Sequence, residues 1–268
     1  MAHALIFDSG VGGLSVVSEI RKRLPKLHLS YVADDAFRPY GTKTETALRA
    51  RLPGLLKTLE NMLAPDLIVI ACNTASVTAL TEIRAAVSVP VVGVVPAIKP
   101  AAKESVSKSI AVLGTPGTVK REYVDSLIDT FASDCSVTLK GSSALVELAE
   151  RRLAGEDISA EAVCDEVTSI FKKAPDIDAV VLACTHFPLL KDMLSPCGPS
   201  HVKWIDSGAA IARRVETVLN GEAVLNAVKS EITDFDETAF LIGPDALTKR
   251  SATFHKFGFS RVVGLCPQ

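Results

Sequence analysis

Residues 66–76 read DLIVIACNTAS and residues 178–188 read DAVVLACTHFP, and these two stretches decide the fold. In each, an acidic residue and a run of apolar letters lead directly into alanine, cysteine and polar residues. A run that is apolar throughout is typical of a strand in a parallel sheet, because helices cover both faces of such a sheet. Two buried strands can look alike by chance. The matching polar letters at their ends nevertheless favour an internal repeat, with Cys72 and Cys184 in equivalent places.

Other apolar runs continue the pattern along the chain, with helical periodicity between most of them, at residues 4–7, 29–33, 89–95, 109–114 and 201–206. This alternation predicts an α/β protein with mainly parallel sheets, in which ligands bind at the carboxyl ends of the strands. A second echo supports the repeat, since ALIFDSG at 4–10 resembles KWIDSG at 203–208.

We therefore expect two similar α/β lobes, each a mainly parallel sheet flanked by helices, with the active site in the cleft between them. The first lobe is predicted to contain residues 1–95 and about 207–268, and the second residues 96–206 or thereabouts.

The composition excludes several classes of partner. The 268 residues carry a formal net charge of −2, and the basic residues are scattered, so no electrostatic footprint for nucleic acid is expected. No apolar run approaches the roughly 18 to 20 residues that span a bilayer. The first residues, MAHALIFDSG, lack a basic segment of the signal-peptide type. We expect a cytoplasmic protein that binds neither nucleic acid nor membrane.

The six cysteines are spread singly, without a Cys-x-x-Cys pair and without histidine at the usual zinc spacings. This spacing predicts neither a disulfide framework nor a metal site. Four of the thiols are interpreted as small buried hydrophobic residues, namely Cys135, Cys164, Cys197 and Cys266. Cys72 and Cys184 differ, because each interrupts an apolar strand at the point where polar side chains converge.

The surroundings of these two thiols favour acid–base chemistry. Cys72 precedes a helix-like stretch with Asn73 and Thr74 as capping-type residues, and a helix N-terminus makes a thiolate accessible near neutral pH. Cys184 has the same context. A cysteine hydrolase would pair one nucleophilic thiol with a histidine, which Cys184 and His186 allow, but Cys72 would then have no role. Two thiols that flank one substrate instead suit removal of a proton from one face of a carbon and delivery to the other.

Residues 8–13 read DSGVGG and join the first predicted strand to a helix. The glycines allow a ligand to approach the backbone, and the amides favour an anion. The loop matches neither a Walker A motif nor G-x-G-x-x-G, so nucleotide binding is the weaker interpretation. A carboxylate or ammonium group suits Asp8 and Ser9 better. The alternative is that the glycines only permit a tight turn.

Several motifs occur together and in order, at residues 7–16 (FDSGVGGLSV), 39–41 (PYG), 71–76 (ACNTAS), 93–101 (GVVPAIKPA), 113–119 (LGTPGTV) and 184–190 (CTHFPLL). In this combination the chain closely resembles bacterial glutamate racemases, of the aspartate/glutamate racemase superfamily. The resemblance implies reversible interconversion of L- and D-glutamate without pyridoxal phosphate or metal, which supplies D-glutamate for peptidoglycan. It also implies a small-molecule substrate and, as often in such enzymes, a homodimer.

By the same resemblance, Cys72 is the base toward D-glutamate and Cys184 the base toward L-glutamate. The substrate's charged groups would be held by Asp8, Ser9, Tyr40, Gly41, Asn73, Thr74, Thr185 and His186. Asp8 and His186 would also assist proton transfer.

One departure from the family concerns a glutamate near the second thiol. Relatives usually carry Cys-Pro some seven residues before it, whereas residues 141–150 read GSSALVELAE here, with serines in place of that pair. Glu150 aligns best with the family glutamate, and Glu147 is near enough to keep the assignment open. A solvated helix face is the alternative for both.

The choice of substrate depends on the residues after the second thiol. Aspartate racemases typically read Cys-Thr-Glu there, whereas residues 184–186 read Cys-Thr-His, which favours glutamate. A racemase for aspartate or a related amino acid is the alternative among enzymes. The alternative outside enzymes is a racemase-like protein that only binds a partner.

Overall fold

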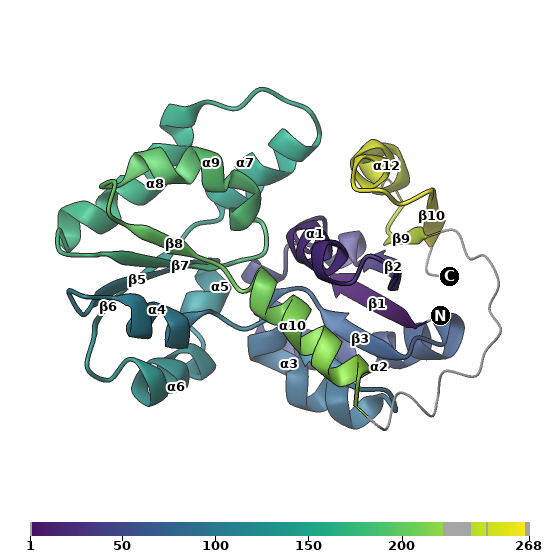
Figure 1. The fold of residues 1–268 in the computed structure, drawn as a ribbon. Helices are drawn as coiled ribbons and strands as arrows, with labels where there is room; N and C mark the ends of the chain where they lie inside the picture. The colour runs from purple at the N-terminus through teal and green to yellow at the C-terminus, as the bar shows by residue number, and fades with distance from the viewer. Residues whose placement is uncertain (1, 222–236, 245, 266–268) are drawn as a thin grey trace. The chain divides into compact units, whose positions relative to one another are not determined.

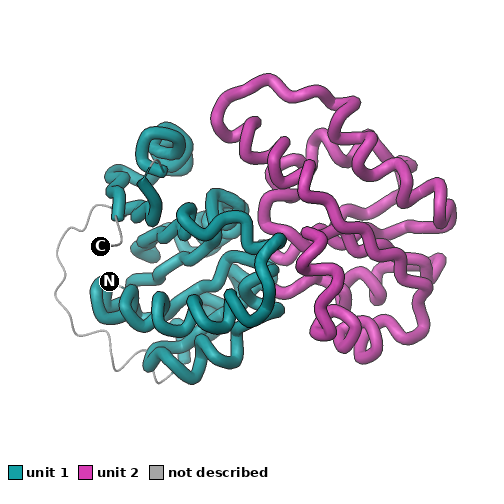
Figure 2. The backbone as a smooth tube through the Cα atoms, turned by 180° about the vertical axis from the view of Figure 1, so that it is seen from behind, with its two compact units in different colours: residues 1–94, 208–268 teal, residues 95–207 magenta. Residues whose placement is uncertain are grey.

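The computed structural model describes residues 2–221, 237–244 and 246–265, and the chain divides into two compact units (Figures 1 and 2). Unit 1 contains residues 1–94 and 208–268, and unit 2 contains residues 95–207. Each unit is a sheet flanked by helices, and all strand pairs in the described residues are parallel. The predicted α/β class with two parallel sheets is confirmed.

The strands of unit 1 lie in the order β10 (Arg261–Leu265), β9 (Thr238–Ile242), β2 (His28–Ala33), β1 (His3–Asp8), β3 (Leu67–Ile70) and β4 (Val91–Gly93). Its described helices are α1 (Leu14–Arg23), η1 (Asp35–Phe37), η2 (Tyr40–Thr42), α2 (Glu45–Leu63), α3 (Asn73–Ala86), α10 (Gly208–Leu219) and α12 (Ala246–Lys256), where η marks a 3₁₀ turn. Helix α2 packs on α3, and α1 packs on α10.

Helix α2 illustrates how the sequence builds these elements. The Thr44 side chain accepts a hydrogen bond from the Ala47 amide at 3.2 Å, which satisfies one of the free N–H groups at the helix start. Leu48, Leu52 and Leu56 recur every fourth residue and are fully buried. This spacing puts them on one face of the helix, and that face joins the core above β1 and β3.

Unit 2 has four strands in the order β6 (Ser136–Gly141), β5 (Ser109–Gly114), β7 (Ala179–Ala183) and β8 (Lys203–Ile205). Its helices are α4 (Ile98–Glu104), α5 (Pro116–Val119), α6 (Glu122–Phe131), α7 (Ala144–Leu153), α8 (Ala160–Lys173), η3 (Phe187–Leu190), α9 (Lys191–Leu194) and η4 (Ser195–Cys197). Figure 1 shows α7, α8 and α9 on one face of this sheet and α4 and α6 on the other. No helix in the described part of the chain has the length and apolar composition needed to cross a membrane.

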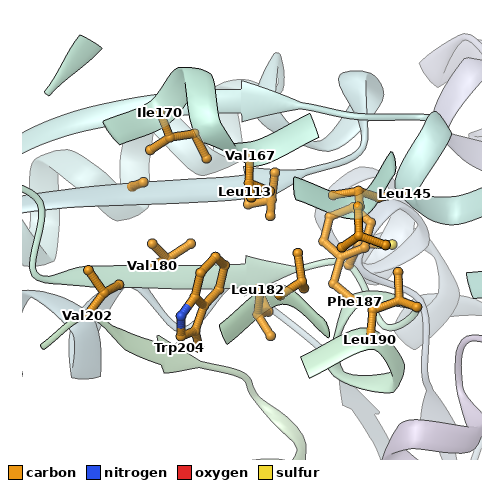
Figure 3. Packing of buried hydrophobic residues seen from close by; sticks show 14 of the residues in the cluster. Leu113, Leu145, Val167, Ile170, Val180, Leu182, Phe187, Leu190, Val202 and Trp204 are labelled. Carbon is orange, nitrogen blue, oxygen red and sulfur yellow. The ribbon is translucent and has the colours of Figure 1, made fainter. Parts of the chain in front are cut away.

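The core of unit 2 explains why its central strands are apolar. Leu113 of β5 and Val180 of β7 are fully buried beneath Leu145 and Val167 of the overlying helices (Figure 3). Side chains of this kind contribute about 1.5–3 kcal/mol each when they leave water. This packing stabilises β5 and β7, and β7 leads directly into Cys184.

The two sheets share one topology, since β2-β1-β3-β4 and β6-β5-β7-β8 have the same order. In each, the chain leaves the central strand toward one neighbour and later returns on its other side, which creates a switch point between β1 and β3 and between β5 and β7. Ligands of open α/β sheets bind at the carboxyl ends of the strands beside such a point. Cys72 follows β3 and Cys184 follows β7, so the two thiols occupy equivalent positions.

The second sequence echo is not equivalent in the fold. The Asp-Ser-Gly at residues 8–10 follows β1, a central strand, whereas that at 206–208 follows β8, an edge strand that corresponds to β4. Ser207 donates a hydrogen bond to the carbonyl oxygen of Val95 at 2.6 Å. Similar letters at two strand ends therefore belong to different places in the two sheets.

The expectation for two of the cysteines was wrong. Cys164 of α8 and Cys197 of η4 form a disulfide, although they are 33 residues apart. Packing between α8 and η4 brings them together, and spacing along the sequence cannot reveal such packing. Cys135 is a free, partly buried thiol, and Cys266 lies outside the described residues.

Candidate active site

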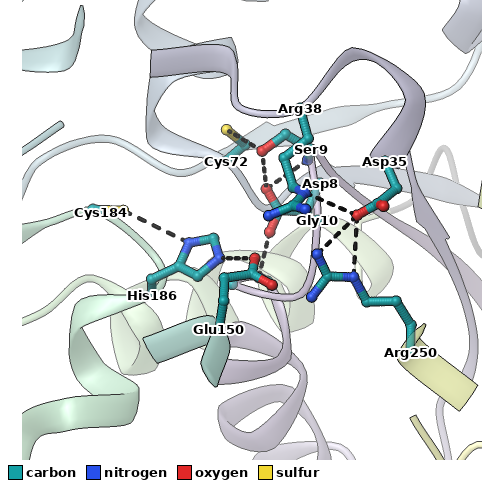
Figure 4. Close-up of polar contacts among 12 residues, drawn as sticks. Asp8, Ser9, Gly10, Asp35, Arg38, Cys72, Glu150, Cys184, His186 and Arg250 are labelled. Carbon is teal, nitrogen blue, oxygen red and sulfur yellow. Dashed lines mark hydrogen bonds and ion pairs between the residues drawn. The ribbon is translucent and has the colours of Figure 1, made fainter. Parts of the chain in front are cut away.

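The first thiol lies where two neighbouring strands end. The backbone N–H of Ala71 donates to the carbonyl oxygen of Phe7 at 2.7 Å, which continues the β1–β3 ladder to the edge of the sheet. Cys72 is the N-cap residue of α3 and is buried. Its Sγ lies 3.9 Å from the hydroxyl oxygen of Ser9 (Figure 4). The fold thus brings together the first thiol and the loop at residues 8–13.

Asp8 organises that loop. Its carboxylate is fully buried and accepts hydrogen bonds from the amides of Ser9 at 2.7 Å and Gly13 at 2.6 Å. Tyr31 donates to the carbonyl oxygen of Gly10 at 2.9 Å and lies 3.4 Å from the Asp8 carboxylate. The sequence predicted that the loop's amides favour an anion, and two of them bind the side chain of Asp8 itself. Asp8 therefore fixes the loop and sets the position of Ser9.

Asn73 and Thr74 open helix α3, and both are buried. The amide nitrogen Nδ2 of Asn73 has no hydrogen-bond partner in the described residues. A buried donor without an acceptor costs about 1–3 kcal/mol, so a bound group that accepts this bond recovers that free energy. A carboxylate oxygen is such an acceptor.

Tyr40 and Gly41 lie in η2, between β2 and α2. The Tyr40 ring is buried, and its hydroxyl donates to Asp34 Oδ2 at 2.6 Å. Burial raises the pKa of Tyr40 well above its usual value, and the Asp34 charge adds to this effect, so the phenol stays protonated and remains a donor. Asp34 in turn binds Arg51 of α2.

Sequence reasoning missed Asp34 and Arg51. The available signal was the polar residue directly after the apolar run at 29–33, which is the same signal that singled out Asp8 and Cys72. Arg51 had no comparable signal, because a basic residue on a helix is usually solvated.

The second thiol belongs to a chain of three side chains in unit 2. Cys184 Sγ lies 3.8 Å from His186 Nδ1, and His186 Nε2 lies 2.8 Å from Glu150 Oε1 (Figure 4). All three residues are buried. Burial by itself lowers the pKa of His186, but the hydrogen bonds to Cys184 and Glu150 and the Glu150 charge outweigh it and raise this pKa to about 10. At neutral pH the ring is a cation that donates toward both partners.

Of the two candidate glutamates, Glu150 is the one that the fold brings to His186. Glu150 is buried against His186, whereas Glu147, one turn earlier on α7, is exposed. The helix is held at its start by Ser142, which accepts from the Leu145 amide at 3.0 Å and donates to Glu166 at 2.7 Å. The Ser142 hydroxyl, one residue before the N-cap residue Ser143, therefore satisfies a free amide at the start of the helix that carries Glu150.

Thr185 lies between Cys184 and His186 in the sequence, just after β7, and it is buried. The described residues contain no group of three or more His, Cys, Asp or Glu side chains that could hold a metal ion. Within unit 1 the fold gathers Asp8, Ser9 and Cys72, and within unit 2 it gathers Glu150, Cys184 and His186.

Comparison with known proteins identifies the family of this chain. Residues 13–215 match the family model described as Asp/Glu/Hydantoin racemase. The chain belongs to this family. It is 48% identical to the glutamate racemase of Shewanella woodyi over 222 residues, which covers 83% of each chain. It is 41% identical to that of Pasteurella multocida, covering 97% of this chain and 95% of the relative.

A solved relative extends the likeness to the three-dimensional structure. The Escherichia coli glutamate racemase, crystallised with L-glutamate and the activator UDP-MurNAc-ala, superposes with a TM-score of 0.90 at 38% identity. The match covers 99% of this chain and 98% of that one. The predicted resemblance to glutamate racemases is confirmed.

Proposed function

We propose that this protein interconverts L- and D-glutamate, with Cys72 and Cys184 as the acid and base on opposite faces of the α-carbon. The observation that carries the proposal is the equivalent position of the two thiols. Each is buried, each follows the strand beside a switch point, and each has a polar partner, Ser9 for Cys72 and His186 for Cys184. A protein that only binds a ligand has no need for this duplication.

In the proposed reaction, one cysteine is a thiolate and the other a thiol. The thiolate takes the α-proton, and the electron pair of the C–H bond remains on the α-carbon and spreads into the carboxylate. The opposite thiol then delivers its proton to the other face, so the product is the enantiomer and the two cysteines have exchanged protonation states. L-Glutamate gives its proton to Cys184, and D-glutamate gives its proton to Cys72.

The neighbouring groups supply the stabilisation that the carbanion needs. The unpartnered Nδ2 of Asn73 donates to the substrate carboxylate, on which negative charge grows in the transition state. Thr74 and Thr185 contribute hydroxyl groups, and Ser9 and the Tyr40–Gly41 turn hold the remaining charged groups. The His186 cation stabilises the Cys184 thiolate and is itself held by Glu150.

An exchange experiment tests this proposal. The purified protein is incubated with L-glutamate in D₂O, and optical rotation and α-deuterium are followed together. We expect rotation to be lost as deuterium enters the α-position. If both the optical rotation and the α-hydrogen are retained, the protein is not a racemase, and the alternative of a racemase-like binding protein is favoured. If L-aspartate exchanges its α-hydrogen faster than L-glutamate, glutamate is not the preferred substrate, and an aspartate racemase is favoured.

Cysteine variants test the two-thiol step. Cys72→Ser and Cys184→Ser should each abolish racemisation, because every turnover needs both an acid and a base, while one of them can still exchange the α-hydrogen on one face. Cys135→Ser is the matched control, since that free thiol precedes β6 instead of following a strand, and it should retain full activity. Full activity in either of the first two variants contradicts the mechanism.

The proposal requires no cofactor. Activity should survive dialysis against a chelator and carbonyl reagents that capture pyridoxal phosphate.

D-Glutamate formed in this way would serve peptidoglycan synthesis in the cytoplasm. A homodimer also remains a prediction, and light scattering during size-exclusion chromatography tests it.

A further inference from the structure

Asp34 is a buried carboxylate that the reaction above does not use. It follows β2 directly, and its backbone N–H donates to the carbonyl oxygen of Asp8 at 2.9 Å, so it is fixed at the carboxyl edge of the sheet beside β1. The side chain has no exposed surface. A buried charge is costly unless it is paired and hydrogen-bonded, and its partners therefore indicate its purpose.

Both oxygens of Asp34 are engaged. Tyr40 Oη donates to Oδ2 at 2.6 Å, Arg51 Nε donates to the same oxygen at 2.7 Å, and Arg51 Nη2 donates to Oδ1 at 2.7 Å. The guanidinium also lies over the Phe37 ring, 5.0 Å from its centroid. This combination of a two-point bond and a stacked face suits arginine and cannot be reproduced by lysine.

Stability alone does not account for this network. Replacing a buried ion pair by well-packed apolar residues is often neutral or stabilising, so a pair of this kind is weak evidence for a stabilising role. What the pair does achieve is geometric. It ties the phenol of Tyr40 to the end of β2 on one side and to α2 on the other.

The consequence falls on the turn that contains Tyr40 and Gly41. Tyr40 belongs to the same hydrophobic cluster as Cys72, and its ring packs edge-on against Phe37 with centroids 6.2 Å apart. With its hydroxyl held by Asp34, the ring has one position, and the short η2 turn that carries it is held relative to the first thiol. The turn's own hydrogen bonds, such as that from the Lys43 amide to the Tyr40 carbonyl oxygen at 3.0 Å, set its local shape, whereas the Asp34 bond ties it to the end of β2.

We propose that Asp34 and Arg51 are positioning residues, which hold the Tyr40–Gly41 turn in the conformation that binds the substrate. This inference rests on the proposed glutamate racemisation. It makes a specific kinetic claim, because groups that only hold a binding turn affect substrate affinity more than the chemical step at the two cysteines.

The test compares Arg51→Lys with Arg49→Lys. Both arginines lie on α2, but Arg49 is exposed and pairs with Glu45 and Glu82, so its replacement is the matched control. For Arg51→Lys we expect the KM for both enantiomers and the dissociation constant for glutamate from calorimetry to rise about tenfold or more, with kcat changed much less. Arg49→Lys should leave all three constants at the wild-type values.

Four further variants make the test independent of folding. Asp34→Asn and Tyr40→Phe should each raise KM, and their double variant should raise it little more than either alone, because both break the same link. Asp34→Asn leaves Arg51 without its ionic partner, so Asp34→Leu with Arg51→Met removes both charges together. That pair should fold, by circular dichroism and melting temperature, and should still show the raised KM.

Three results overturn the inference. They are a wild-type KM in folded Arg51→Lys, additive effects of Asp34→Asn and Tyr40→Phe, and a wild-type KM in the charge-free pair. A wild-type protein that does not racemise glutamate refutes the proposed function, and this inference with it. An active wild type with unaffected variants refutes only the positioning role.

Discussion

Replacing Glu150 by glutamine tests the charge state of the second half of the site. The substitution keeps the size of the side chain and removes its charge, so His186 loses the carboxylate 2.8 Å from its Nε2. Burial, which favours the neutral ring, is then opposed by Cys184 alone. We expect the pKa of His186 to fall from about 10, so that the ring loses its proton at a lower pH than in the wild type.

The magnitude follows from linkage. A histidine whose pKa is higher in the folded protein binds more protons there than in the unfolded chain, so its stabilising contribution is complete below pH 6.5 and is lost as pH rises through about 10. The interval between these pKa values corresponds to at most about 5 kcal/mol. Removing one partner of a buried ion pair typically costs about 3–5 kcal/mol. We therefore expect Glu150→Gln to lower the free energy of unfolding by about 3 kcal/mol at pH 7, and by much less at pH 10.5.

The matched control is Glu147→Gln, on the same helix but exposed. Urea unfolding at both pH values measures the stability difference. Proton NMR of the histidine rings follows the titration, with the His186 signal among the five histidines identified from its loss in His186→Gln. The reasoning fails if the wild-type ring titrates near pH 6.5, or if the two glutamate variants have the same stability at pH 7.

Three further predictions concern the stability of the fold. Gly13→Ala places a Cβ 2.7 Å from a tyrosine hydroxyl and should lower the free energy of unfolding by about 1–3 kcal/mol. Gly54→Ala, whose Cβ has nothing within 4 Å, should raise it by up to about 1 kcal/mol, and thermal melting compares the two variants. Cys164→Ser should cost about 2–4 kcal/mol in urea unfolding of the oxidised protein and nothing once reductant has opened the bond to Cys197 in the wild type. Burial lowers the pKa of His3 to about 4, so acid should cost up to about 3 kcal/mol between pH 6.5 and 4, and His3→Gln should flatten that slope in urea titrations.

The parts of the fold that sequence predicts are those whose signal is local. An apolar run followed by polar letters marks both the buried strand and its carboxyl end, and this is why β3 with Cys72 and β7 with Cys184 were recognisable. The same signal misleads when the letters match and the topology does not. Asp206 follows an edge strand, although the residues around it resemble those around Asp8.

Contacts between distant elements are the parts that sequence did not predict. The disulfide joins α8 to η4 across 33 residues, and Asp34 meets Arg51 because α2 packs over the sheet. Neither contact produces a periodic pattern in the sequence, since each depends on how two elements pack against one another. The sequence favoured Glu150 over Glu147 by resemblance and left the choice open, because the burial of Glu150 beside His186 depends on how α7 packs.

The two thiols have unlike partners, yet the proposed reaction is thermodynamically symmetric. Cys72 has the neutral hydroxyl of Ser9 at 3.9 Å, whereas Cys184 has the His186 cation at 3.8 Å. L- and D-glutamate have equal free energy in water, so kcat/KM must be the same in both directions for any variant. The cation beside Cys184 therefore cannot raise kcat/KM in one direction alone. It can change the common value of kcat/KM, and it can change how each direction divides that value between kcat and KM.

Glu150→Gln should reveal this division. It perturbs only the Cys184 side, so kcat should fall by different factors with L- and D-glutamate, while kcat/KM falls by one common factor. Progress curves from each enantiomer, followed by circular dichroism, measure both constants. Equal changes in kcat for the two substrates would mean that His186 and Glu150 act on both thiols alike, which contradicts the assignment of this pair to Cys184.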